Sequence, residues 1–327
     1  MIKRLILAFG LPILLIVLAF VSGPMVGWSP ALTTSEVRTV EGLTSALELD
    51  RYLVESESHV LKLKPDLARG IVWFDSTKRD KTPISIVYIH GFTASRREMF
   101  PVWDRIAKEL GANLYYARVK GHGLEDGEEL GQITAQDFID EGRVALAIGR
   151  KIGEKVILAG MSTGAPIIET LANENRDTGD IQALVFISPN HTPAIPGARF
   201  VSGPFGPMWA RLILGTHRSF NTINDLHAKY WTPRYRSEAI PAMMDLVNSA
   251  LRIDLGAIKV PTLTLYTSKD KVVDVSLIEK RHAEIGAKKK KIINLPEASR
   301  HELAGDAVAP EAVDAAVKTV LEFLQSN

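Results

Sequence analysis

The stretch VILAGMSTGAP at residues 156–166 decides the fold. Its first four residues are apolar, as in a strand buried on both faces, and residues 163–173 continue with a helical pattern. At the turn between them, Gly160 and Gly164 provide clearance for a sharp bend that carries Ser162 at its tip. This arrangement predicts that Ser162 is an activated nucleophile. A serine that only caps the helix is the alternative.

Outward from this stretch, short β-branched runs alternate with longer helical patterns from residue 70 onward. The alternation predicts an α/β fold, with a mostly parallel sheet flanked by helices. The predicted strands span residues 71–74, 84–89, 113–117, 155–159, 183–187, 262–266 and 291–295. The predicted helices span residues 97–110, 135–152, 163–173, 276–285 and 311–324, with a further one at residues 50–58.

Two segments depart from the alternation. Residues 28–69 form an N-terminal extension, to which we assign a packing role only. Residues 190–260 are rich in aromatics and prolines and are predicted to be a lid inserted into the core. Apolar residues recur there at helical spacing after Pro241, which indicates either a helix docked on the core or the underside of an acyl-binding pocket. The core is therefore expected at residues 70–189 and 261–327.

A serine nucleophile needs a base and a group that orients the base. Asp270 comes just after one predicted strand and His301 just after the next, which is the chain order Ser, Asp, His. Parallel strands share one carboxyl edge, so both side chains can reach Ser162 there. We predict that His301 is the base and Asp270 its partner. Asp274 is a rival for the acid, and a turn-forming role for Asp270 also stays open.

The loop His90-Gly91-Phe92 follows another predicted strand and supplies a second part of the site. Acyl transfer needs two backbone amides to bind an oxyanion, one after the nucleophile and one from such a loop. We predict these amides at Thr163 and Phe92, with Gly91 allowing the loop to bend. His90 is predicted to brace the loop, so neither a metal nor a cofactor is expected.

The composition excludes several kinds of partner. The chain has 39 basic and 38 acidic side chains and a net charge of +1, so no strong field would attract nucleic acid. It has no cysteine, which excludes disulfides, thiolate metal ligands and a cysteine nucleophile. A small-molecule acyl substrate is the expected partner.

Residues 1–27 have the composition of a targeting segment. Lys3 and Arg4 precede an apolar run at residues 5–21, which fits either a cleaved signal peptide or an uncleaved membrane anchor. Positive residues remain on the cytoplasmic side. The rest of the chain is therefore expected in the periplasm or on the outer face of a bacterial membrane, with attachment through the apolar run.

These motifs resemble those of the α/β-hydrolase superfamily, particularly carboxylesterases, monoacylglycerol lipases and serine aminopeptidases. The matching residues are His90-Gly91-Phe92, Gly121-His122-Gly123, Gly160 to Gly164, Asp270-Lys271-Val272-Val273 and His301. The resemblance implies an eight-stranded, mostly parallel sheet and a helical lid inserted after the sixth strand. It also implies cofactor-free catalysis through an acyl-enzyme intermediate on Ser162.

The expected function is a serine hydrolase that cleaves carboxylic esters of short or medium acyl chains. A serine aminopeptidase or another acyl-bond hydrolase is the alternative, because fold and nucleophile do not specify the substrate. An aminopeptidase would need an acidic anchor for the substrate amine, and Glu238 and Asp245 in the insertion are the candidates. A non-catalytic, membrane-tethered ligand-binding protein is the alternative from another class.

Overall fold

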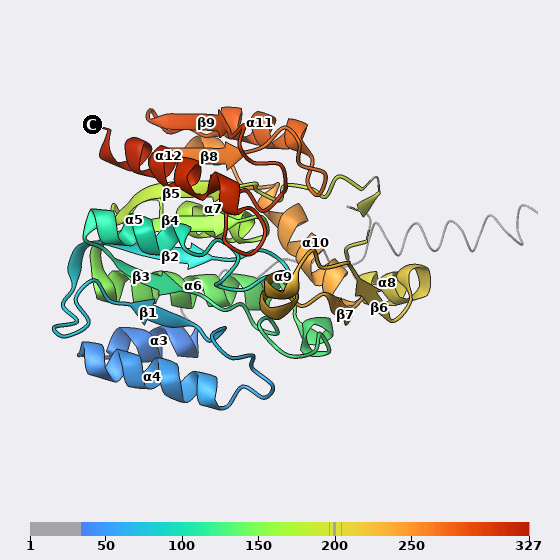
Figure 1. The fold of residues 1–327 in the computed structure, drawn as a ribbon, viewed down its shortest axis with the longest axis horizontal. Coiled ribbons are helices and arrows are strands. Elements are labelled where there is room, and N and C mark those ends of the chain that lie inside the picture. Colours follow the sequence, from blue (N-terminus) through green and yellow to red (C-terminus); the bar gives the residue numbers. More distant parts are fainter. Residues whose placement is uncertain (1–33, 196, 199–200, 204, 327) are drawn as a thin grey trace, which may run out of the picture.

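A mostly parallel sheet forms the centre of the molecule in the computed structural model, which describes residues 34–195, 197–198, 201–203 and 205–326. Its seven strands have the order β1-β3-β2-β4-β5-β8-β9 (Figure 1). β1 runs antiparallel to β3, and the other neighbours are parallel. The strands are β1 (Gly70–Val72), β2 (Thr82–Ile89), β3 (Asn113–Tyr116), β4 (Gly153–Met161), β5 (Ile181–Ile187), β8 (Thr262–Tyr266) and β9 (Lys290–Asn294).

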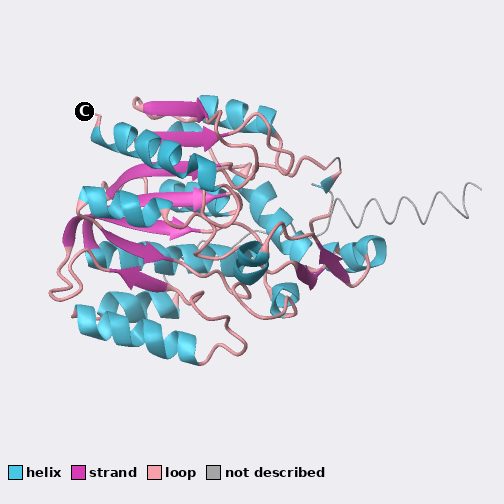
Figure 2. Ribbon diagram, in the orientation of Figure 1, coloured by secondary structure: helices cyan, strands magenta, loops and turns pink. Residues whose placement is uncertain are grey.

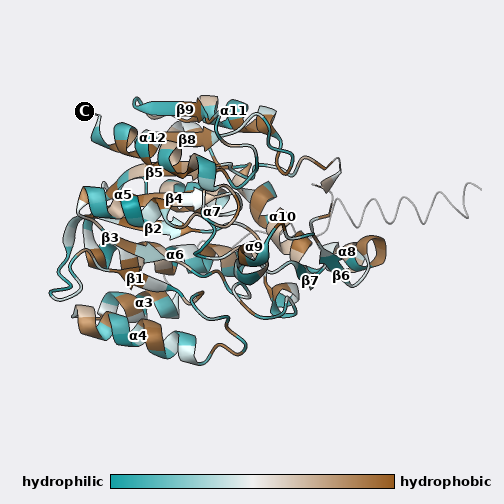
Figure 3. Cartoon of the chain, in the orientation of Figure 1, coloured by the Kyte–Doolittle hydropathy of each residue, from teal (hydrophilic) through white to brown (hydrophobic). Residues whose placement is uncertain are grey.

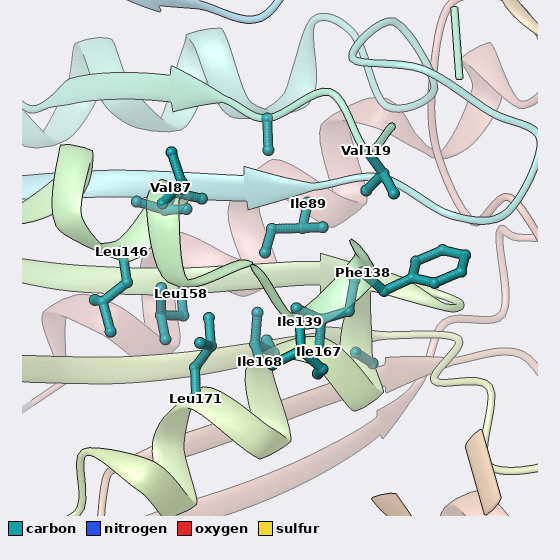
Figure 4. Packing of buried hydrophobic residues seen from close by; sticks show 14 of the residues in the cluster. Val87, Ile89, Val119, Phe138, Ile139, Leu146, Leu158, Ile167, Ile168 and Leu171 are labelled. Carbon is teal, nitrogen blue, oxygen red and sulfur yellow. The ribbon is translucent and has the colours of Figure 1, made fainter. Parts of the chain in front are cut away.

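Helices cover both faces of this sheet (Figure 2). On one face, α6 and α7 pack against the apolar side chains of β2 and β4, and Figure 4 shows Val87 and Leu158 of the sheet beside Leu146 and Leu171 of the helices. On the other face, α5 and α12 pack against each other and against the sheet. The helices are α3 (Ser35–Gly42), α4 (Ala46–Ser58), α5 (Val102–Leu110), α6 (Ala135–Ile152), α7 (Gly164–Glu174), α8 (Gly206–Leu214), α9 (Asp225–Tyr230), α10 (Ala239–Ala250), α11 (Val275–Glu284) and α12 (Val313–Gln325).

The predicted strands and core helices are confirmed, with ends that shift by a few residues. The largest shift is in α5, which begins at Val102 instead of residue 97. Pro101 explains the difference, because a proline disfavours helical geometry in the residue before it. The residues ahead of Pro101 form turns, and Glu98 among them is buried.

The sheet contains seven strands within the described residues, so the expectation of eight is corrected. The segment before β1 forms α3 and α4 instead of a strand. Thr34 caps α3, and Ser45 and Glu48 form a capping box at the start of α4. A capping box satisfies two backbone N–H groups at the start of a helix. It explains why α4 begins before the predicted residues 50–58.

Buried charges join α3 and α4 to the core. Arg69 forms ion pairs with Glu36 of α3, Glu57 of α4 and Glu141 of α6. Arg118 binds Glu57 through a further two hydrogen bonds. Loss of one partner from such a network would leave a buried charge without compensation. The N-terminal helices are therefore packed as part of the core.

The insertion between β5 and β8 contains α8, α9 and α10 together with a small antiparallel sheet of β6 (His217–Ser219) and β7 (Arg234–Arg236). Two expectations are corrected by this arrangement. The insertion follows the fifth strand of the described sheet, not the sixth, and it is not purely helical. Strands of three residues are too short to show an alternating pattern in the sequence.

The apolar stripe predicted after Pro241 lies on α10. Met243, Met244 and Val247 are buried, and α10 packs against α6 and α7. The stripe is therefore docked on the core. An acyl-binding role for its underside stays a prediction.

The predicted anchor or signal at residues 1–27 lies outside the described residues. Among the residues that the structure places, no helix combines the length and the apolar character needed to cross a membrane.

Candidate active site

Ser162 lies at a sharp turn between β4 and α7. Its backbone φ is +51°, a left-handed conformation that is costly for a residue with a side chain. Ser162 N donates to Ile187 O, and Ser162 O accepts from Ala165 N and Asn190 N, so the strained turn is held on both sides. Ser162 is not the helix cap, because the N-cap residue of α7 is Thr163.

The two glycines of the turn face main-chain atoms at close range. A Cβ on Gly164 would lie 2.2 Å from Ile89 O, and a Cβ on Gly160 would lie 2.6 Å from the carbonyl carbon of Gly164. No side chain fits at these distances. The Gly-x-Ser-x-Gly pattern therefore follows from the close packing of the turn against β2 and α7.

His301 and Asp270 meet Ser162 at the carboxyl ends of the parallel strands. Ser162 Oγ lies 2.8 Å from His301 Nε2, and His301 Nδ1 lies 2.7 Å from Asp270 Oδ2. Because a carboxylate only accepts hydrogen bonds, His301 Nδ1 donates, and Nε2 accepts the hydroxyl proton of Ser162. The structure thus brings together the three residues singled out in the sequence.

The pKa values of the base and the acid move in opposite directions. Burial of the His301 ring disfavours its charged form, but the hydrogen bond and negative charge of Asp270 outweigh burial, so the pKa of His301 is raised from 6.5. Burial likewise disfavours the Asp270 carboxylate, but the hydrogen bond and charge of His301 hold the pKa of Asp270 below 3.8. Asp270 is therefore ionised near neutral pH and stabilises an imidazolium.

Asp270 makes the contacts that both of its predicted roles require. Its Oδ2 binds His301, while its Oδ1 accepts from Val272 N at 2.7 Å and from Val273 N at 3.2 Å. The turn thus fixes the carboxylate that binds His301. The rival Asp274 instead caps α11 by accepting from the N–H of Ser276.

The peptide that carries the predicted oxyanion amide of Phe92 is fixed by its neighbours. Gly91 O lies 2.9 Å from His90 Nδ1, and a trans peptide directs its N–H opposite to its C=O. The Phe92 N–H therefore points away from His90. A Cβ on Gly91 would lie 3.1 Å from Ser162 Cβ, so the loop packs against the nucleophile. Within the described residues, neither Phe92 N nor Thr163 N donates a hydrogen bond to another protein atom.

His90 and His122 are buried without charge. Burial lowers the pKa of His90 to about 4 and that of His122 to about 3. His90 Nε2 accepts from Val119 N at 3.2 Å while Nδ1 donates to Gly91 O. Both ring nitrogens are engaged, as a bracing role requires. In the part of the chain that the structure describes, no group of His, Asp and Glu residues is arranged to hold a metal ion.

Two residues that the sequence reasoning missed hold the loop that carries His301. Ser188 Oγ donates to His301 O at 2.8 Å, and Thr267 Oγ1 donates to Ala298 O at 2.9 Å. Each of these hydroxyl residues directly follows a strand of the sheet, β5 or β8. Their position at the carboxyl edge is the signal that could have found them.

Asn190 was also missed, and it connects the nucleophile to the insertion. Its amide nitrogen lies 3.3 Å from Thr163 Oγ1 and 3.4 Å from Met243 Sδ of α10. Pro189-Asn190 has the composition of an ordinary turn, so the sequence carried no signal for this contact.

The fold and the Ser–His–Asp arrangement define the chain as an α/β-hydrolase. The family model for serine aminopeptidase, S33, matches residues 81–307, so the chain belongs to that family. No curated protein sequence matches the chain.

Solved structures share this fold at low sequence identity. One of the metagenome-derived lipolytic enzymes LipS and LipT is 17% identical with a TM-score of 0.64, over 81% of this chain and 100% of that chain. A soluble variant of the monoglyceride lipase of Saccharomyces cerevisiae is 14% identical with a TM-score of 0.60, over 81% of this chain and 96% of that chain. The monoacylglycerol lipase of Paleococcus ferrophilus is 17% identical with a TM-score of 0.55, over 79% of this chain and 98% of that chain. At these identities the likeness establishes the fold.

Proposed function

We propose that the chain is a serine hydrolase that cleaves carboxylic esters of short or medium acyl chains. The observation that carries the proposal is the hydrogen-bonded line from Ser162 Oγ through His301 to Asp270. Membership of a serine peptidase family supports a serine nucleophile, and the lipolytic enzymes that share the fold support ester chemistry.

In the proposed reaction, His301 Nε2 takes the proton of Ser162 as Oγ attacks the ester carbonyl. The N–H groups of Phe92 and Thr163 stabilise the negative oxygen that forms. As the carbon–oxygen bond to the alcohol breaks, His301 returns the proton to the leaving oxygen, and an acyl group remains on Ser162. Water then attacks this acyl-enzyme by the same steps and releases the acid.

Contacts in the insertion favour a neutral acyl substrate over a substrate with a free amine. Glu238, one candidate amine anchor, pairs with Arg236 at 2.6 Å. Asp245, the other candidate, accepts from Gly203 N at 2.9 Å, and burial raises its pKa to about 6. Both carboxyls are therefore engaged within the insertion. We therefore propose the aminopeptidase as the second candidate.

An apolar region beside the oxyanion loop is the proposed acyl-binding site. The ring of Tyr235 contacts that of Phe92 in an edge-on arrangement, with centroids 5.3 Å apart. Met243 of α10 reaches Asn190 next to the nucleophile. Side chains of the insertion thus border the predicted oxyanion site. The proposal is that a short or medium acyl chain lies against these side chains.

We propose further that the protein is exported and works at a membrane surface, as the composition of residues 1–27 predicts. α8 supports the surface contact, because Met208, Leu212 and Ile213 are 52%, 71% and 69% exposed. Figure 3 shows the hydrophobic colouring of α8 at the edge of the molecule. No acidic residue occurs between residues 181 and 224. An exposed apolar helix face in a stretch of sequence that carries no acidic side chain suits a bilayer surface.

The surface contact is tested with the full chain and two ester substrates, one dissolved and one embedded in anionic vesicles. The double substitution Leu212→Ser with Ile213→Ser is expected to lower hydrolysis of the embedded ester only. An equal loss on both substrates, or no loss on either, would count against membrane contact through α8.

A fluorophosphonate probe tests the proposed hydrolase, because it reacts with activated serines. Wild type is expected to be labelled and Ser162→Ala is not, whereas a non-catalytic binding protein would leave both unlabelled. A panel of nitrophenyl esters graded by chain length then defines acyl preference, with aminoacyl anilides as the competing substrates. Faster cleavage of the anilides would show that the enzyme prefers amide bonds to ester bonds, against the proposal.

A further inference from the structure

Glu98 is a buried carboxyl next to the active site that the proposed reaction does not use. It lies between the oxyanion loop and α5 and is 3% exposed. Its Oε2 accepts from Gly91 N at 2.8 Å and from the Tyr88 hydroxyl at 2.9 Å. A Cβ on Gly91 would lie 2.9 Å from Glu98 Oε1 and 3.1 Å from Ser162 Cβ. The carboxyl and the nucleophile therefore border the same glycine.

Gly91 is held at both of its polar groups. Glu98 binds its N–H, and His90 Nδ1 binds its carbonyl oxygen. Two successive peptide groups are thereby fixed, and the second of them carries the N–H of Phe92. Since an oxyanion donor acts only when it is aimed before charge develops, the Glu98 contact bears directly on the reaction.

We propose that Glu98 is a positioning residue that fixes the Phe92 amide for the oxyanion, and that its charge limits how well the oxyanion is stabilised. The inference rests on the proposed function, because an oxyanion forms only where Ser162 attacks an acyl group. In its neutral form Glu98 anchors the loop without adding a charge beside the oxyanion. In its ionised form it adds a negative charge beside a developing negative charge.

The surroundings of Glu98 bring its pKa close to neutral pH. Burial raises the pKa of Glu98 to about 7, against the opposing effect of the Gly91 N–H and the Tyr88 hydroxyl. The titratable groups that face it from other elements are Tyr88 on β2 and His301 and Glu302 on the loop after β9. Arg97, which precedes Glu98 in the sequence, is paired with Asp306. Turnover is therefore expected to decline as the pH rises past about 7.

Two substitutions separate the anchoring role from the charge. Glu98→Gln keeps an oxygen that can accept from Gly91 N but cannot ionise, so kcat at neutral pH is expected within about threefold of wild type and the alkaline decline is lost. Glu98→Ala removes the anchor, and kcat is expected to fall about 10- to 100-fold with little change in KM. Tyr88→Phe, which removes the other bond to Glu98 and leaves Gly91 held, is expected to lose less than Glu98→Ala.

The measurements are kcat and KM for a nitrophenyl ester across pH, with thermal unfolding of each variant. Wild-type kcat in Glu98→Ala, or an alkaline decline that persists in Glu98→Gln, overturns the inference. If Glu98→Ala does not fold, the pH profile of Glu98→Gln decides alone. Fluorophosphonate labelling of wild type separates the two proposals. If wild type is not labelled, the proposed hydrolase itself is wrong. If wild type is labelled but the Glu98 variants keep its kcat and its pH profile, only the role of Glu98 is wrong.

Discussion

The carboxyl edge of the sheet and the insertion beside it are held in different ways. At the edge, Ser162, Asp270 and His301 each follow a strand, and hydrogen bonds to neighbouring loops fix them. In the insertion, α10 is held by apolar packing on α6 and α7, and α8 leaves large apolar side chains exposed. Under the proposed function, the chemistry belongs to the hydrogen-bonded edge, and the contact with substrate belongs to the insertion, which side-chain packing holds.

This difference separates the expected effects of substitutions. At the edge, a change of one atom in the triad is expected to alter either turnover or folding, because the polar side chains of Ser162, His301 and Asp270 are hydrogen-bonded to one another. In the insertion, a change of side chain alters the shape of the proposed acyl site and leaves the triad in place. The predictions below test this separation, from the largest effect to the smallest.

Asp270→Asn is expected to lower kcat by about 1,000- to 10,000-fold, because an amide cannot hold His301 in the donating tautomer or stabilise its charge. Asp274→Asn is the matched control, since Asp274 only caps α11. It is expected to retain kcat and to lose at most about 1 kcal/mol of stability. Steady-state kinetics on one ester compares the two, and equal losses would show that the acid was assigned wrongly.

Gly164→Ala is expected to destabilise the fold by about 2 to 4 kcal/mol, because its Cβ would collide with Ile89 O and separate α7 from β2. Gly42→Ala is the control, since a Cβ there meets nothing within 4 Å. In α3 it is expected to be neutral or to stabilise by up to about 1 kcal/mol. Denaturant unfolding measures both, and a neutral Gly164→Ala would contradict the close packing of the turn.

The raised pKa of His301 sets the acid limb of activity. His301 must be neutral to accept the Ser162 proton, so activity is lost as the pH falls through a pKa above 6.5. The upward shift of the His301 pKa also stabilises the folded state below pH 6.5. This stabilisation is lost as the pH rises through the pKa that His301 has in the folded protein. In a Ser162→Ala background, NMR titration of the His301 ring is expected to show this pKa, and Asp270→Asn is expected to lower it. An unchanged titration would remove Asp270 as the cause.

Much of the edge could be predicted from the sequence because its signals are local. Apolar runs mark the strands. Ser162 directly follows one of them, and Asp270 and His301 lie in the loops that follow two others. Two signals were present and unused: the Ser45-x-x-Glu48 capping box of α4, and the hydroxyl residue after each of β5 and β8.

Other features depend on contacts that sequence patterns do not encode. Glu98 falls in the first turn of the predicted helix 97–110, where an acidic residue suits the helix dipole. Because α5 begins only after Pro101, Glu98 instead turns inward to Gly91. The pairing of β6 with β7 similarly joins segments that are far apart in the chain and too short to carry a pattern.

The smallest effect is expected in the insertion, from Met243→Ala. Shortening this side chain next to Asn190 enlarges the proposed acyl site, so the ratio of kcat/KM for longer over shorter nitrophenyl esters is expected to rise about three- to tenfold. Met208→Ala on α8 is the control, because Met208 is exposed and its loss should leave the ratio for dissolved esters unchanged. A loss of kcat on every ester would instead mean that α10 supports the triad. The division between a rigid edge and an adaptable insertion would then fail, since Met243 would act on the chemistry through Asn190 and Thr163.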